Sequence, residues 1–236
     1  MKRVLMFTVL AASTALVMAR ADAPNTLTDA EKAAGWVLLF DGTTTAGWHG
    51  YNQATMPEGW AVKDGALTRV GKATDISSDK EYGSFDFRFD WKIAAGGNSG
   101  VMYHVVESPK YKSSYFTGPE FQLLDNLRHP DAKAGKNGNR TAGSDYDIYP
   151  PAADVTKPIG EWNEARIVIH GAHVEHWMNG KKLLDYELWS DTWKADVAAS
   201  KFKEWPDYGL AKSGHLVLQE HDFEVAFRNM KIKALP

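Results

Sequence analysis

One stretch, residues 85–93, places the strongest constraint on the fold of this chain. Its sequence, FDFRFDWKI, alternates between apolar and charged side chains without a break. Successive side chains of a β-strand point to opposite faces, so this alternation indicates a strand with one dry face and one wet face. Such a strand is typical of an antiparallel sheet that packs one of its faces on a core.

Shorter patterns extend the β interpretation over most of the chain. Asn179-Gly180 separates two strand-like runs, residues 174–178 and 181–186. This dipeptide suits the type I′ turn of a hairpin, in which both central positions have positive φ. Residues 225–232 indicate a last strand. Many short strands separated by Gly, Asn, Asp and Pro predict an all-β fold, namely an antiparallel jelly-roll β-sandwich.

One segment interrupts the β pattern with a helical period. In residues 190–205, Trp193, Val197 and Lys201 fall on one stripe, and Pro206 ends the run. We expect a short helix that packs on the edge of the sandwich.

A second interruption, residues 126–145, is polar and contains several glycines. Loops of this length inside compact domains are usually functional or disordered, so we expect long loops beside a binding groove.

The N-terminal residues indicate export. Lys2 and Arg3 precede an apolar run, residues 4–18, and Ala19-Arg20-Ala21 offers a signal-peptidase site. A membrane anchor is the alternative, although the run is short for a span. The predicted divisions are a signal peptide at 1–21, a linker or short helix with a capping-box spacing at 22–34, and a single domain at 35–236. This organisation predicts a protein of the bacterial periplasm or medium.

Composition excludes several classes of function. The chain has no cysteine, which rules out thiol catalysis and cysteine-bound metals. Its formal charge is −3, and removal of the basic leader makes it more negative. A mildly acidic chain without a basic cluster is a poor binder of nucleic acid, so we expect a small-molecule partner. The oligomeric state is left open.

Polar side chains gather on one face of three predicted strands. Glu120 and Gln122 are two residues apart and project together, as do Gln219 and His221. Asn98 and His104 are further apart but share the same parity on their strand. A carboxylate on a sheet face costs free energy unless it is paired, hydrated or used. Polar groups on one sheet face make a groove for a polar ligand, and a carbohydrate is the obvious candidate.

Several short phrases, in a specific order, resemble those of the 3-keto-disaccharide hydrolase family, which has a concanavalin A-like lectin/glucanase sandwich. The resemblance runs from Gly35 to the C-terminus. It rests on WVLLFDG at 36–42 with GW at 47–48, WAVKDG at 60–65, GNSGV at 97–101, EFQLLDN at 120–126, GEWN at 160–163, EHWMNG at 175–180, LQEH at 218–221 and FRN at 227–229.

The resemblance implies cleavage of sugars that are already oxidised at C3. A 3-keto group acidifies the proton on C2, so a carboxylate or histidine can remove it. The resulting enolate expels the aglycone from C1, and water then adds. A non-catalytic carbohydrate-binding module is the first alternative. An ordinary retaining glycosidase ranks third, because it needs two carboxyl groups about 5–5.5 Å apart.

Glu120 and His221 are the candidate proton-transfer pair, and either of them could be the base. The candidate substrate-binding residues are Asn98, His104, Gln122, Asp125, Tyr146, Gln219 and Arg228. Gln122, Asp125 and Arg228 have a structural alternative, and His104 departs from the family pattern. Asp125 has the opposite parity to Glu120 and could instead cap the following loop, Arg228 could form an ordinary ion pair, and position 104 would be arginine in the family pattern.

No cofactor is expected, and a divalent cation is the open alternative. Glu120, Asp125, His104 and His221 could form an oxygen- and nitrogen-rich site if their strands abut. His173 and His176 have opposite parity and make a poor pair of ligands. Aromatic rings that could stack on a sugar are those of Tyr103, Tyr111, Tyr115, Tyr146 and Trp162.

Overall fold

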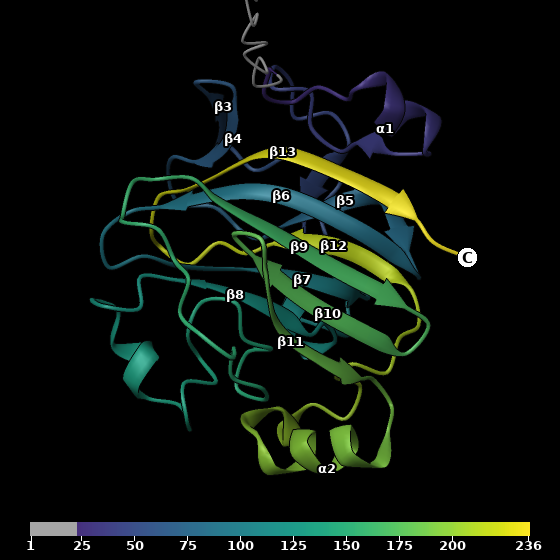
Figure 1. Cartoon of the computed structure of the whole chain (residues 1–236), viewed down its shortest axis with the longest axis vertical. Helices are drawn as coiled ribbons and strands as arrows, with labels where there is room; N and C mark the ends of the chain where they lie inside the picture. Colours follow the sequence, from purple (N-terminus) through teal and green to yellow (C-terminus); the bar gives the residue numbers. More distant parts are fainter. Residues whose placement is uncertain (1–22) are drawn as a thin grey trace, which may run out of the picture.

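The computed structural model describes residues 23–236, which form two packed antiparallel sheets with few helices (Figure 1). The eight strands of the larger sheet are β1 Val37–Leu38, β3 Trp60–Lys63, β4 Ala66–Arg69, β6 Phe85–Ile93, β9 Asn163–His170, β10 His173–Met178, β11 Lys181–Glu187 and β13 Val225–Ala234. Their order is β11-β10-β9-β6-β13-β4-β3, and β1 pairs with β13. The predicted all-β sandwich is confirmed.

The smaller sheet carries the residues that matter most for function. Its five strands are β2 Trp48–Gly50, β5 Ile76–Tyr82, β7 Asn98–Val105, β8 Glu120–Leu124 and β12 Gly214–Leu218. Their order is β2-β5-β12-β7-β8, so β8 lies at one edge beside β7. In the register of this pair, Gly100 faces Gln122 and Met102 faces Glu120.

The core lies between the two sheets and follows the alternation of the strands. Phe85, Phe87 and Phe89 of β6 are buried there, as the FDFRFDWKI pattern predicts. Phe121 and Leu123 of β8 reach the same core from the other sheet. Because neighbouring residues on a strand face opposite ways, Glu120 and Gln122 project from the far side of the smaller sheet.

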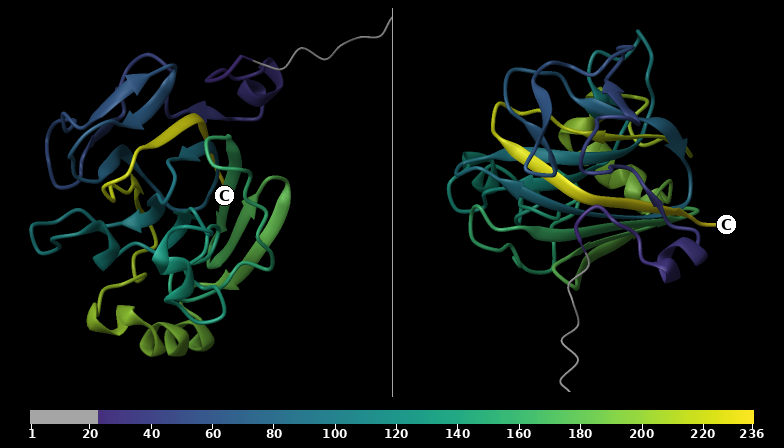
Figure 2. Two further views of the ribbon diagram at one scale, coloured as in Figure 1. Left: turned by 90° about the vertical axis from the view of Figure 1, so that its left-hand side faces the viewer. Right: turned by 90° about the horizontal axis from the view of Figure 1, so that it is seen from above.

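Two α-helices and three 3₁₀ helices complete the fold, and α2 lies at one end of the sandwich in both Figure 1 and Figure 2. The helices are α1 Asp29–Ala33, η1 Ser114–Phe116, η2 Pro130–Lys133, α2 Asp191–Ala199 and η3 Lys201–Glu204. The capping box predicted before α1 is present, with Thr28 and Glu31 each accepting a backbone N–H of the other. In residues 23–236, no helix is both long and apolar enough to cross a bilayer.

The helical segment at 190–205 is divided, whereas the sequence predicts one run. Ser200 has an extended backbone, with φ −94° and ψ 179°, and its side chain accepts the N–H of Phe202 at 3.0 Å. A serine that caps a new turn ends the preceding helix. Lys201 therefore begins η3 and does not share a helix face with Trp193. Trp193 is buried in the core.

The long polar loop covers the free edge of β8. Tyr146 donates its N–H to the carbonyl of Glu120 at 3.0 Å, and Gly143 donates to the carbonyl of Gln122 at 2.8 Å. This pairing protects an edge that would otherwise expose unpaired backbone groups. The predicted signal peptide, residues 1–21, lies outside the described residues.

Candidate functional site

A cavity of about 350 Å³ opens on the side of the smaller sheet that faces away from the core. Its walls come from the sheet, from the loop before β8, from the loop that covers β8 and from η3. The lining residues are Asp75, Asn98, Ser113, Tyr115, Glu120, Gln122, Tyr146, Lys201, Gln219, Glu220 and His221. The structure thus brings together six of the nine predicted site residues, namely Asn98, Glu120, Gln122, Tyr146, Gln219 and His221.

Glu120 occupies the floor of this cavity. Its carboxyl group lies over Gly100, where a side chain on the neighbouring strand would collide with it. The residue is only 4 % exposed, and burial raises the pKa of its carboxyl group to about 8, with a smaller contribution in the same direction from Asp75. The positive charge of Lys201 opposes this shift. A carboxylate with so high a pKa is a stronger base than an exposed one.

Two amide oxygens in the cavity have no hydrogen-bond donor from the described residues. Gln122 donates its Nε2 to Oδ1 of Asn98 at 3.2 Å, which leaves its own Oε1 buried and unpaired. The Oε1 atom of Gln219 is likewise buried without a partner. A buried acceptor without a donor costs about 1–3 kcal/mol. Hydroxyl groups of a bound sugar would satisfy both.

Asp75 is a cavity residue that the sequence analysis did not identify. It accepts a hydrogen bond from the Ser114 hydroxyl at 2.5 Å and another from the N–H of Glu220 at 2.9 Å. Burial raises the pKa of its carboxyl group. The Glu220 carboxylate forms an ion pair with Arg69 at 2.6 Å.

His221 lies exposed at the rim of the cavity. Its ring centre is 6.3 Å from that of His129. A histidine at the mouth of a cavity can exchange protons with both ligand and solvent.

Lys201 also lines the cavity and was missed, as were Ser113 and Tyr115 among the site residues. Its Nζ lies 4.1 Å from the centre of the Tyr146 ring, within the range of a cation–π interaction. One signal in the sequence pointed to it, since a lysine is unusual on the apolar stripe of a short packed helix. The others come together only through tertiary packing.

The other three predicted substrate-binding residues, His104, Asp125 and Arg228, do not line this cavity. His104 has a φ of 54°, which breaks the strand alternation, and its buried ring interacts with the carbonyl of Gly83 at 2.9 Å. Arg228 lies on the larger sheet, where it pairs with Asp90 at 3.1 Å.

Asp125 caps a loop, as its structural alternative predicts. It accepts backbone N–H groups from Gly96 at 2.8 Å and from Leu127 at 3.2 Å. The four residues of the open divalent alternative are divided, since Glu120 and His221 line the cavity while Asp125 and His104 lie outside it. Within the described residues, ligand atoms of His173, Glu175 and Asp185 converge to within 4.8 Å, but these lie on the larger sheet.

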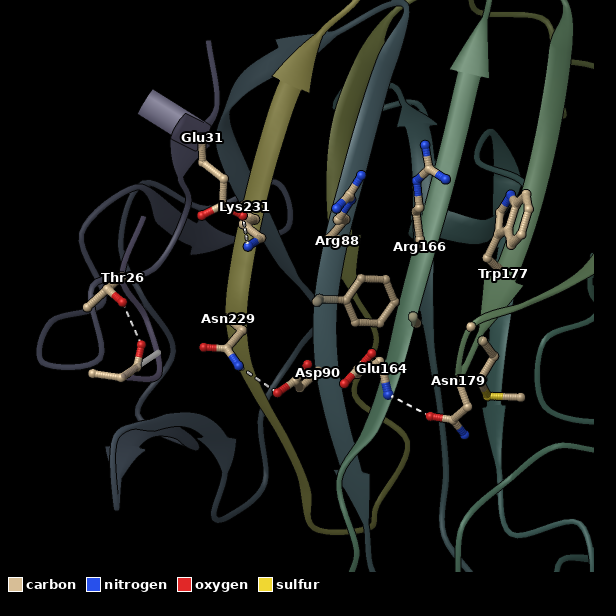
Figure 3. Close-up of a pocket in the computed structure, with 15 residues that line it drawn as sticks. Thr26, Glu31, Arg88, Asp90, Glu164, Arg166, Trp177, Asn179, Asn229 and Lys231 are labelled. Carbon is tan, nitrogen blue, oxygen red and sulfur yellow. Dashed lines mark hydrogen bonds and ion pairs between the residues drawn. The ribbon is translucent and has the colours of Figure 1, made fainter. Parts of the chain in front are cut away.

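A larger groove of about 530 Å³ lies on the outer face of the larger sheet, beside α1 (Figure 3). Its polar groups already pair with one another. Asn229 donates to Asp90 at 2.7 Å, and Asn179 accepts the N–H of Glu164 at 3.0 Å. Among the described residues, no lining side chain of this groove carries a buried polar atom without a partner. The smaller cavity, with the raised pKa of Glu120 and two unpaired amide oxygens, is the candidate site.

Comparisons with known proteins agree with this fold. A family model described as the 3-keto-alpha-glucoside-1,2-lyase-like domain matches residues 35–233. The 3-keto-disaccharide hydrolase of Bacteroides thetaiotaomicron is 35 % identical over 230 residues, which cover 86 % of this chain and 79 % of that protein.

Two crystal structures of candidate glycosyl hydrolases from Parabacteroides distasonis are also similar. The first is 41 % identical, with a TM-score of 0.84 over 91 % of this chain and 100 % of that chain. The second is 27 % identical, with a TM-score of 0.62 over 80 % of this chain and 99 % of that chain.

Proposed function

The chain belongs to the 3-keto-alpha-glucoside-1,2-lyase-like domain family, and on this premise we propose that it cleaves the glycosidic bond of 3-keto-disaccharides. The observation that carries the proposal is the buried carboxyl group of Glu120, whose pKa is raised to about 8 in a cavity with two unpaired amide oxygens. This combination suits removal of a weakly acidic C–H proton from a ligand rich in hydroxyl groups.

The reaction begins at C2 of the oxidised sugar. Glu120 takes the C2 proton, the C–H electron pair forms the C2–C3 double bond, and the C3 carbonyl becomes an enolate. The C3 carbonyl then re-forms, and the electron pair of the C2–C3 double bond moves to form a C1–C2 double bond. The bond from C1 to the aglycone oxygen breaks as this happens. The departing oxygen needs a proton, and we assign its supply to His221, which lines the same cavity. Addition of water across the new C1–C2 double bond completes the hydrolysis.

The remaining cavity residues position the sugar. Oε1 of Gln122 and Oε1 of Gln219 accept hydroxyl hydrogens, and Asn98 holds the Gln122 amide in place through its 3.2 Å hydrogen bond. The Tyr115 and Tyr146 rings offer apolar faces for the sugar C–H groups.

The test compares Glu120→Gln with the unaltered protein on 3-keto-trehalose and on trehalose, followed by NMR. We expect the unaltered protein to cleave the keto-sugar alone, and Glu120→Gln to lose about 10²–10⁴-fold in kcat without loss of folding. Glu204→Gln, an exposed carboxyl on η3, is the matched control.

Other outcomes would point to other functions. Cleavage of unoxidised trehalose would indicate an ordinary glycosidase, and binding without turnover would indicate a carbohydrate-binding module. Loss of activity with a chelator would establish a role for a divalent cation. Full activity of Glu120→Gln would remove Glu120 from the mechanism.

A further inference from the structure

We propose that Lys201 is a third catalytic group, whose ammonium stabilises the enolate oxygen that forms at C3. This inference rests on the proposed function and assigns the one role that Glu120 and His221 leave unfilled. An enolate needs a positive charge or a hydrogen-bond donor where its negative charge develops. Lys201 is the one lysine or arginine among the cavity-lining residues of the described chain.

The backbone of Lys201 is anchored to the loop that covers β8. Its N–H donates to Oδ2 of Asp147 at 2.9 Å. Asp147 is in turn held by Arg140, whose Nε lies 2.6 Å from its other carboxyl oxygen. These contacts fix the start of η3 at the cavity wall. A group held before the reaction starts requires no reorganisation when charge develops.

The ammonium of Lys201 is held by aromatic rings and not by a carboxylate. It lies 4.1 Å from the ring centre of Tyr146 and 5.1 Å from that of Phe202. Within residues 23–236 it has no carboxylate oxygen within 4.0 Å. Asp131, an acid near the cavity, is instead occupied by Arg140 at 2.9 Å and by the Tyr146 hydroxyl at 2.6 Å.

A partly buried cation without a counter-ion is free to pair with a new anion. Glu120 and Lys201 line the same cavity without direct contact, so a substrate carbon and its neighbouring carbonyl can lie between them. The proton then leaves C2 for Glu120 while the developing C3 oxygen accepts a hydrogen bond from Lys201. When the aglycone departs, the C3 carbonyl re-forms and the ammonium is unchanged.

The experiment measures Lys201→Met, Lys201→Arg and Lys203→Met on 3-keto-trehalose. Lys203 is an exposed lysine of the same 3₁₀ helix and serves as the matched control. We expect Lys201→Met to lower kcat about 10²–10³-fold, with little change in KM. Lys201→Arg retains the positive charge and should recover part of kcat, and Lys203→Met should be unaffected.

Two further measurements report on C2 proton removal and on the electrostatics of Glu120. Exchange of deuterium into C2 of the unreacted keto-sugar in heavy water should slow in parallel with kcat in Lys201→Met. The rise of kcat/KM with pH should also move to higher pH, because the charge of Lys201 lowers the pKa of Glu120. The acids that act in the opposite direction, Asp75, Asp131 and Asp145, remain in the variant.

Three results would overturn the inference or its premise. Unchanged kcat in Lys201→Met, with an active parent protein, refutes the role of Lys201 alone. A covalent adduct between Lys201 and the keto-sugar, trapped when borohydride reduces an imine to a secondary amine, would replace the electrostatic role by imine formation. An inactive parent protein refutes the proposed function itself, before any variant is compared.

Discussion

Replacement of Gly100 by alanine tests how the candidate base is held. A β-carbon added at Gly100 would lie 2.7 Å from Cδ and 2.8 Å from Cγ of Glu120. Because carbon atoms in contact are about 3.5–4.0 Å apart, the carboxyl group has to move by roughly 1 Å. The φ angle of Gly100 is not in the left-handed region, so alanine adds no backbone strain there.

A shift of roughly 1 Å at a reacting group can cost about 100-fold in rate, so we expect kcat/KM of Gly100→Ala to fall by about that factor. Crowding of one side chain costs about 1–3 kcal/mol, which lowers the melting temperature by roughly 10 °C or less. The assays are steady-state kinetics on 3-keto-trehalose and thermal unfolding followed by circular dichroism.

The matched control is Gly71→Ala, because the nearest atom to a β-carbon at this position is the Cα of Gly59, at an ordinary distance of 3.8 Å. This variant should retain full kcat/KM. If Gly100→Ala were as active as the parent protein, the position of the Glu120 carboxyl over the glycine would not matter for the reaction. Removal of the C2 proton by Glu120 would then be wrong.

Three further predictions concern the carboxyl groups of Asp125, Glu120 and Asp145. Asp125→Ala should lower the stability by about 1–2 kcal/mol, because loop N–H groups lose their acceptor, while kcat stays unchanged; chemical denaturation and kinetics check this. The kcat/KM of the parent protein should rise with pH through about 8, since Glu120 must be ionised to act as a base, and a flat pH profile would contradict this. The melting temperature should fall as the pH rises from about 5 to 8, because folded Glu120 and Asp145 keep protons that the unfolded chain releases near pH 4. Glu120→Gln and Asp145→Asn should each make the melting temperature depend less steeply on pH.

The parts of the fold with an undisturbed local period could be predicted from the sequence. In β6 the period of two is unbroken, and its phenylalanines lie in the core as the pattern requires. The same period places Gln122 beside Glu120 on one face of β8, and it also gave Asp125 the opposite parity that suits a cap.

The period failed where the backbone departs from it or where distant segments meet. The φ of 54° at His104 breaks the alternation along β7, and one sequence gives no sign of that angle. Ser200 ends α2 and sends Lys201 toward the cavity, although the helical period continues past it. Asp75 enters the site because the N–H of Glu220, far along the chain, binds its carboxylate.

The cavity has one wall of regular sheet and another wall of loops. Glu120 and Gln122 are on β8, which is hydrogen-bonded to β7 on one side and to the covering loop on the other. Tyr115 comes from the short helix η1 and Tyr146 from the covering loop. Exchange of those segments would change which aglycones fit while the carboxylate base keeps its place. A laboratory that wants a new substrate range should therefore randomise the loops and leave the two strands alone.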